Sequence, residues 1–243
     1  MSEFSRRADE RVPSGNVPGF DGLRDERNAP FYLSRMPRIR TPDETAQEVA
    51  RSFAKVVHDF LTIAGQQPIR LTPEHLERMH RGIFRTTFPE RAGRFRDDDV
   101  TYGALWREDG VQQRRLMDGL PAEEVPPALN AAFAPYTEEL RRCAPAQRTT
   151  AQATAVAVSL YAEILRIHPF PDGNTRTSFP LLQGALRSLG GLPCHFAGAE
   201  PQRREALGWA VQPDPARRTV EPLVAFVRER MKTSPLVLTR MEG

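Results

Sequence analysis

The sequence predicts a mainly helical single domain that carries one small β-hairpin. Between Thr41 and Lys232, most apolar residues recur at helical spacing, and at 243 residues the chain is long enough for one full core. The stretch around Asp109-Gly110 instead has short apolar runs separated by a turn, which is typical of a hairpin. Residues 150–167 are so apolar that they leave little polar face, so we expect a central buried helix there.

The composition is ordinary for a globular protein and argues against several classes of partner. The net charge is only +3, because 34 basic residues are offset by 31 interleaved acidic ones, so no nucleic-acid partner is expected. Cys143 and Cys194 form no CxxC and no metal-ligand spacing. No apolar stretch reaches membrane-spanning length, so no membrane partner is expected. Residues 1–28 lack the apolar run of a secretory signal; a cytoplasmic location is expected, with delivery into another cell as an effector left open.

The boundaries of the domain follow from helix-start signals. Residues 1–40 are charged and broken by prolines and glycines, so we expect a mobile N-terminal arm. Thr41-Pro42-Asp43-Glu44 is a capping box that begins the first helix, and Thr72-Pro73-Glu74 begins the second. The ordered domain is therefore predicted over 41–232, followed by a C-terminal tail at 233–243.

The remaining elements follow in order along the chain. A hairpin is expected within about 93–117, and a helix with an internal Pro135 over 121–143. After the central helix come three more predicted helices: 175–189, 200–211 and 219–232.

The loop between the central helix and the next one carries the chemistry. The buried helix ends at His168, whose imidazole has an ordinary pKa of ~6.5 and can accept a proton from a hydroxyl. A new helix begins near Asn174, and Gly173 permits a backbone conformation that aims several N–H groups at one point, where phosphate binds well. Asp172 could hold Mg²⁺ against such phosphates, and Arg176 could bind another phosphate oxygen. Together they indicate phosphoryl or nucleotidyl transfer.

This loop resembles that of the Fic family, whose pattern is HPFxxGNxRxxR. Six fixed residues match, and Asp172 stands at the acidic position; the six are His168, Pro169, Phe170, Gly173, Asn174 and Arg176. The apolar helix before the loop, the helix after it and an upstream Gly93-Arg94-Phe95-Arg96 leading into the hairpin also fit. The resemblance covers roughly 41–232 and implies a Fic-fold helical bundle around a central buried helix, with the hairpin as a flap that docks the target protein.

The resemblance also implies an activity. Fic enzymes are protein AMPylases and related transferases, so the chain is expected to move a nucleoside monophosphate, by default AMP from ATP, to a Tyr, Thr or Ser hydroxyl of a target protein in a Mg²⁺-dependent reaction. His168 would be the general base and Asp172 the magnesium ligand. Phe170 would anchor the loop, and the flap would align the target by strand addition. The nucleotide phosphates would lie on Gly173, Asn174, Thr175 and Arg176.

Three positions depart from the family pattern. Phe179 replaces the second arginine of the motif, Thr175 stands where glycine is common, and Pro180 lies inside the following helix. Two alternatives to nucleotidyl transfer therefore stay open. One is transfer of another phosphate-linked group, such as UMP, phosphocholine or phosphate. The other is a degenerate member that binds a nucleotide or a partner protein without turnover.

Other features give weaker predictions. The inhibitory pattern [S/T]xxxE[G/N] of many Fic proteins is absent from the sequence, which favours an unrestrained enzyme or control by a separate regulatory protein. The hairpin could also be a purely structural ribbon. Structural or surface roles are expected for His58, His75, His80 and His195, and solvated positions for Arg203-Arg204 and Arg217-Arg218.

Overall fold

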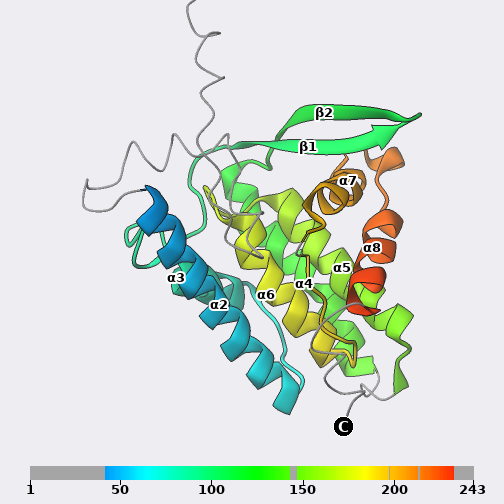
Figure 1. Cartoon of the computed structure of the whole chain (residues 1–243), viewed down its shortest axis with the longest axis horizontal. Coiled ribbons are helices and arrows are strands. Elements are labelled where there is room, and N and C mark those ends of the chain that lie inside the picture. Colours follow the sequence, from blue (N-terminus) through cyan, green and yellow to red (C-terminus); the bar gives the residue numbers. More distant parts are fainter. Residues whose placement is uncertain (1–41, 143–146, 197, 213, 233–243) are drawn as a thin grey trace, which may run out of the picture.

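The computed structural model describes residues 42–142, 147–196, 198–212 and 214–232. It is mainly helical, as predicted, with a two-stranded antiparallel sheet lying across one end of the helices (Figure 1). The predicted arm at 1–40 and tail at 233–243 lie outside the described residues. Within these ranges no helix combines the length and the apolar character needed to cross a membrane.

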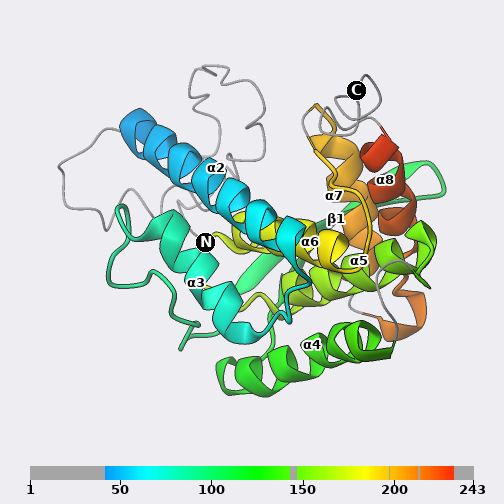
Figure 2. The ribbon, with the colours of Figure 1, turned by 90° about the horizontal axis from the view of Figure 1, so that it is seen from below.

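The core is built around α5 (Thr150–Ile167), which confirms the predicted central helix. It lies between α4 (Val125–Arg142) and α6 (Asn174–Ser188), and α8 (Glu221–Lys232) packs against it as well (Figure 2). Several of its side chains have no exposed surface at all: Ala157, Val158, Tyr161, Ile164 and Ile167. Since each large apolar side chain contributes about 1.5–3 kcal/mol when fully buried, α5 is held firmly along its length.

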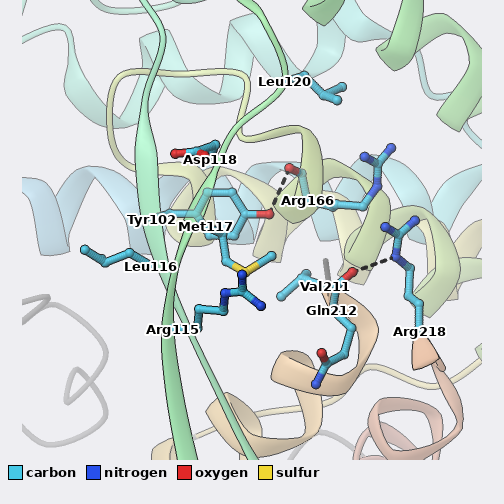
Figure 3. A pocket seen from close by; sticks show the side chains of 10 residues that line it. All are labelled: Tyr102, Arg115, Leu116, Met117, Asp118, Leu120, Arg166, Val211, Gln212 and Arg218. Carbon is cyan, nitrogen blue, oxygen red and sulfur yellow. Dashed lines mark hydrogen bonds between the residues drawn. The ribbon is translucent and has the colours of Figure 1, made fainter. Parts of the chain in front are cut away.

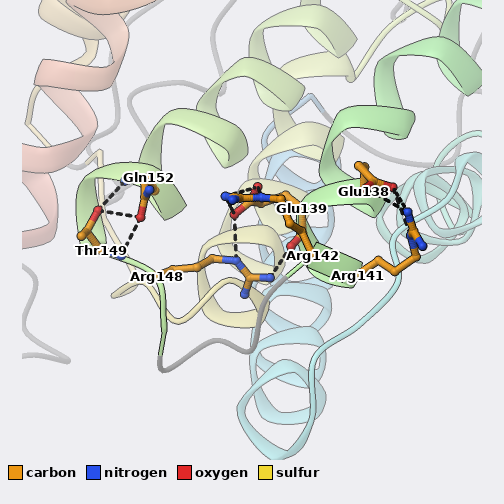
Figure 4. Close-up of polar contacts among 7 residues, drawn as sticks. All are labelled: Glu138, Glu139, Arg141, Arg142, Arg148, Thr149 and Gln152. Atoms are coloured by element: carbon orange, nitrogen blue, oxygen red, sulfur yellow. Dashed lines mark hydrogen bonds and ion pairs between the residues drawn. The ribbon is translucent and has the colours of Figure 1, made fainter.

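Polar contacts fix the beginning of α5 (Figure 4). The hydroxyl of Thr149 accepts a bond of 3.2 Å from the N–H of Gln152, whose Oε1 accepts one of 3.0 Å from the N–H of Thr149. Just before this cap, Arg148 is 1% exposed and donates from Nε to Oε1 of Glu139 at 3.1 Å. The Arg148–Glu139 pair thus joins α4 to the residue just before the cap of α5.

Two helices cover the other side of α6. They are α2 (Pro42–Gln66) and α3 (Pro73–Phe84), and both begin at the proline that the sequence indicated. At the start of α3 the hydroxyl of Thr72 bonds the ring of His75 at 2.9 Å rather than a backbone N–H. The other proposed cap residue, Thr41, lies outside the described residues.

The hairpin consists of β1 (Thr101–Glu108) and β2 (Val111–Asp118), so its strands begin later than the predicted boundary at 93. Between them Asp109 has φ 50° and Gly110 has φ 79°, and a type I′ turn requires positive φ at both central residues. The predicted Asp-Gly turn is therefore confirmed. Next to β1 lies α7 (Glu200–Ala210), so close that a Cβ on Gly208 would stand 1.6 Å from the carbonyl oxygen of Leu105.

The helix α4 begins later than predicted. A 3₁₀ turn occupies Ala122–Glu124, and α4 starts only at Val125. The reason is the pair Pro126-Pro127, which lacks N–H groups and fits only the first turn of a helix.

Candidate active site at the end of the central helix

His168 ends α5 in a left-handed conformation, with φ 53° and ψ 60°. Its N–H still donates to the carbonyl of Ile164 at 3.0 Å, so the residue closes the last helical turn. Such a conformation is uncommon for a residue other than glycine, although histidine adopts it more readily than most. Here it turns the chain abruptly out of the helix and into the loop.

The imidazole of His168 is held on two sides. Its Nδ1 lies 3.4 Å from the carbonyl oxygen of Leu165, and a proton on Nδ1 directed at that oxygen leaves Nε2 as the basic nitrogen. The ring also stacks on Tyr102, with centroids 4.7 Å apart and planes 2° from parallel. Tyr102 is fixed in turn, because its hydroxyl donates to the carbonyl of Arg166 at 3.2 Å. Sequence reasoning did not identify Tyr102, which lies 66 positions before His168.

Arg96 joins the loop to the base of the hairpin. Its side chain is 0% exposed, and its Nε donates to the carbonyl of His168 at 2.8 Å. Its two terminal nitrogens donate to Asp98 and Leu120, on the two sides of the hairpin base. A buried cation at the C-terminus of α5 also interacts favourably with the helix dipole. Arg96 therefore places His168 and the hairpin in one hydrogen-bonded unit.

Phe170 and Asn174 close the loop from inside. Phe170 has no exposed surface, and its backbone N–H and carbonyl bond the side-chain amide of Asn174 at 2.9 and 2.8 Å. The Asn174 side chain is therefore turned inward onto the backbone of Phe170, so only its N–H, at the start of α6, could contact an anion. The side chain shapes the loop.

His80 supports the loop from below. Its ring stacks on Phe170, with centroids 3.9 Å apart and an angle of 14°. Nδ1 accepts the N–H of Gly93 at 2.8 Å, so Nε2 carries the proton and donates to the carbonyl of Asp172 at 3.1 Å. Burial lowers the pKa of His80 to about 4. A structural or surface role was predicted for His80, and the structure assigns it a structural one. Its buried ring bonds the backbone of Asp172, the residue proposed to hold magnesium.

Gly173 is the N-cap of α6 and has φ 75°. A residue with a side chain rarely adopts this φ, and a Cβ at this position would stand 2.3 Å from the ring of Phe84. Only glycine therefore fits here. The first turn of α6 then directs the backbone N–H groups of Asn174, Thr175 and Arg176 toward the start of the helix. This start of α6 has the chemistry of an anion site.

Two charged residues lie at the same end of α6. Asp172 is half-buried beside the cap, and the guanidinium of Arg176 lies 5.9 Å from the centroid of Phe84. No group of three or more histidine, cysteine, aspartate or glutamate side chains in the described residues could hold a metal ion. A single carboxylate fits Mg²⁺ only when phosphate oxygens supply further ligands, which is common in nucleotide enzymes.

Phe179, the altered motif position, lies among aromatic rings. Its ring centroid is 4.9 Å from Phe196 and 5.9 Å from Phe53 of α2. In the same region the prediction of a solvated Arg203 is wrong. Arg203 is 5% exposed and donates to Glu200 and to the hydroxyl of Tyr161, so it stabilises the core.

A cavity of about 280 Å³ lies between the hairpin and the ends of α5 and α7 (Figure 3). Tyr102 forms part of its wall, so the cavity adjoins the residue on which His168 stacks. Arginines from three separate segments also line it: Arg115, Arg166 and Arg218. Sequence reasoning could not group them, because they are far apart along the chain.

Comparisons with known proteins agree with this architecture. Residues 70–186 match the model of the Fic/DOC family. No curated protein matches the chain. The fold is similar to a Fic domain containing signaling protein from Bacteroides thetaiotaomicron, with 15% identity, a TM-score of 0.63, and coverage of 84% of this chain and 74% of that one.

Two further solved structures show the same likeness. One is the BepC protein of Bartonella tribocorum, a VirB-translocated effector with bound AMPPNP, at 17% identity and a TM-score of 0.57 over 79% of this chain and 88% of that one. The other is Fic-1 (residues 134–508) from C. elegans, at 17% identity and a TM-score of 0.61 over 89% of this chain and 58% of that one. The chain thus has the Fic fold, and its residues 70–186 match the model of the Fic/DOC family.

Proposed function

We propose that this chain transfers a nucleoside monophosphate, AMP by default, from a nucleoside triphosphate to a Tyr, Thr or Ser hydroxyl of a target protein. The observation that carries the proposal is the placement of His168. Its ring is held by Tyr102 and Leu165 with Nε2 as the basic nitrogen, and a single short loop separates it from the anion-binding start of α6. A general base beside a phosphate site is the arrangement that phosphoryl-group transfer to a hydroxyl needs.

The reaction would proceed as a displacement at the α-phosphorus. Nε2 of His168 takes the proton of the target hydroxyl, whose oxygen forms a bond to the α-phosphorus. The bond between that phosphorus and the bridging oxygen breaks, and pyrophosphate leaves. The N–H groups at the start of α6 and the side chain of Arg176 stabilise the negative phosphate oxygens. Magnesium, when bound, would neutralise phosphate charge, and Asp172 is the residue that would hold it.

The comparisons support a nucleotide as donor. BepC, which has a similar fold, was solved with AMPPNP bound. Members of the Fic family are generally transferases, and the residues of the motif loop are present here apart from the second arginine.

A second candidate is transfer of a different phosphate-linked group, such as UMP, phosphocholine or a γ-phosphate. Phe179 favours it, because an aromatic ring packed on Phe53 and Phe196 cannot bind a phosphate as the family's second arginine does. The alternative that is not an enzyme is a protein that binds a nucleotide without turnover.

The test is a donor panel on the purified full-length chain with a cell lysate as acceptor. The donors are ATP labelled at the α- or the γ-phosphate, α-labelled UTP, GTP and CTP, and choline-labelled CDP-choline, each with Mg²⁺. Incorporation of α-label but not γ-label from ATP is the expected result, and His168→Ala is expected to abolish it. Label from γ-labelled ATP or from CDP-choline would favour the second candidate. Tight nucleotide binding with no label in any protein would contradict both.

A further inference from the structure

The two strands of the hairpin have different surroundings. β1 lies between β2 and α7 (Figure 1). The backbone of α7 at Gly208 touches the backbone of β1 at Leu105. Among the described elements, β2 makes extensive contact only with β1. The outer edge of β2 therefore presents backbone N–H and carbonyl groups to which a further strand could add.

The register of the hairpin defines rows of side chains across the sheet. Ala104, Trp106 and Met117 are buried, so the face that carries them is the inner face. Because side chains alternate along a strand, Tyr102 and its partner Met117 form one inner row, and Ala104 and its partner Arg115 form the next. Arg114 projects from the opposite, outer face of β2, opposite Leu105.

The first of these rows leads to the catalytic base, since Tyr102 stacks on His168. A strand added to β2 would lie about 4.8 Å outside it. The residue of the added strand that lies opposite Met117 would face inward, in the row of Tyr102. Because Tyr102 stacks on His168, we assign to this residue the hydroxyl that His168 deprotonates. Two positions further toward the turn, about 7 Å along the strand, the next inward-facing residue of the added strand would lie opposite Arg115.

The charge at this second place is positive. Arg115 is paired with Ala104 through the backbone, but its side chain is exposed and makes no hydrogen bond or ion pair with another described residue. It lines the cavity of Figure 3 together with Arg166 and Arg218. Arg166 is paired with Glu163, and Arg218 donates through Nε to the carbonyl of Gln212. Asp118, the carboxylate among the lining residues, follows Met117 and by alternation belongs to the outer face.

We propose that the target segment carries an aspartate or glutamate two residues from the modified hydroxyl, on the side that places it opposite Arg115. The inference rests on the proposed transfer to a protein hydroxyl and adds a determinant of acceptor specificity to it. Opposite charges on directly neighbouring strands attract, and like charges repel, so Arg115 selects for an acid and against a lysine at this position.

The experiment is an oriented peptide library around a fixed Tyr, Thr or Ser, labelled by the full-length chain with the donor that the panel identifies. The variants are Arg115→Ala, Arg115→Glu and, as matched control on the outer face of the same strand, Arg114→Glu. Peptides with Asp or Glu at the second residue before or the second residue after the hydroxyl should be labelled better by the parent than peptides with Asn there. The expected preference is about two- to fivefold, the range of a partly exposed ion pair. Arg115→Ala should remove the preference, Arg115→Glu should reverse it toward Lys and Arg, and Arg114→Glu should keep it.

Each other outcome overturns the inference. A parent that shows no acid preference at either position contradicts it, as does a preference that survives in Arg115→Glu or is lost equally in Arg114→Glu. Label in lysate proteins but in no peptide of the library would show that an extended acceptor segment is not what the hairpin binds, while the proposed transfer would stand. Absence of label in every acceptor would contradict the proposed function, and this inference with it.

Discussion

The candidate active-site loop at 168–176 and the hairpin lie side by side but are built in opposite ways. In the loop, Phe170 is fully buried, Asn174 closes the backbone, and His80 and Arg96 bond it from two sides. In β2, by contrast, Val111 is 59% exposed and Leu116 is 66% exposed, and the outer edge has no extensive partner among the described elements.

The difference fits the two roles proposed for these regions, catalysis by the loop and target binding by the hairpin. Groups that take part in bond making work best when they are already in place before the substrate arrives, because their reorganisation then adds nothing to the barrier. An edge strand that must accept varied polypeptide segments gains more from open backbone groups and exposed side chains. We therefore expect changes in the loop to alter rate or stability, and changes in β2 to alter the choice of acceptor.

The largest expected effect comes from removing the proposed base. His168→Ala should lower the rate of transfer about 10²- to 10⁴-fold, because proton transfer by a positioned side chain contributes that much. Nucleotide affinity and the thermal unfolding midpoint should change little, since the anion site and the core remain. The check is transfer of label together with calorimetric titration of nucleotide. A variant with the parental rate would show that His168 is not the base.

Gly173→Ala tests how rigid the loop is. A left-handed conformation costs an alanine about 1–2 kcal/mol, and its Cβ would also meet the Phe84 ring, which adds about 1–3 kcal/mol. The matched control is Gly110→Ala in the hairpin turn, where φ is also positive but no atom lies within 4 Å. Denaturant unfolding should show the greater loss at Gly173. Equal losses of unfolding free energy in the two variants would mean that the Phe84 ring moves aside and that the loop is no more rigid than the turn.

His80 predicts a pH dependence of stability. Its pKa in the folded protein is about 4, below the ordinary value of 6.5, because burial disfavours the charged ring. The unfolded chain binds a proton below about pH 6.5 while the folded protein does not. The stabilisation is thus complete above pH 6.5 and is lost as the pH falls toward 4, by about 3 kcal/mol.

The variant that isolates this effect is His80→Gln, which can still donate and accept but does not titrate. Unfolding free energies of both proteins between pH 7 and pH 4 should converge as the pH falls. Parallel curves would contradict the assignment.

Asp172→Ala should weaken nucleotide binding only in the presence of Mg²⁺, because the carboxylate contributes through the metal and the phosphates. We expect about a tenfold loss with Mg²⁺, which is the scale of a hydrogen bond to a charged group. Without Mg²⁺, parent and variant should bind alike. The check is calorimetric titration of nucleotide under both conditions. An equal loss of affinity with and without Mg²⁺ would show that Asp172 does not act through the metal.

The smallest effect is expected at Phe179. Phe179→Arg should tighten binding of ATP relative to ADP by a few-fold at most, since the new charge could reach the outer phosphate but gives up contacts with Phe53 and Phe196. Phe179→Leu controls for the lost aromatic contacts. If the ratio of the two affinities is the same in all three proteins, position 179 does not face the phosphates.

Local features of the fold could be read from the sequence because each depends on neighbouring residues. The helix starts at Pro42 and Pro73 and the turn at Asp109-Gly110 were predicted from such signals. The start of α4 was placed too early, although Pro126-Pro127 held the information. For the site, the motif loop gave the residues proposed to act on the substrate.

The residues that hold this loop could not be predicted in the same way. Tyr102, His80 and Arg96 reach it from 66, 88 and 72 positions before His168. Their roles depend on how α3, the hairpin and α5 pack, and no local spacing reports such packing. The buried state of Arg203 was missed for the same reason, because its partner Tyr161 lies in another helix.

The left-handed backbone of His168 has a consequence for how the protein could change over time. A residue other than glycine gives up about 1 kcal/mol or more in that conformation. Selection for thermal stability alone would therefore favour His168→Gly, which fits the helix end better and removes the imidazole. The proposed base and the stability of the helix end thus place opposite demands on this one position.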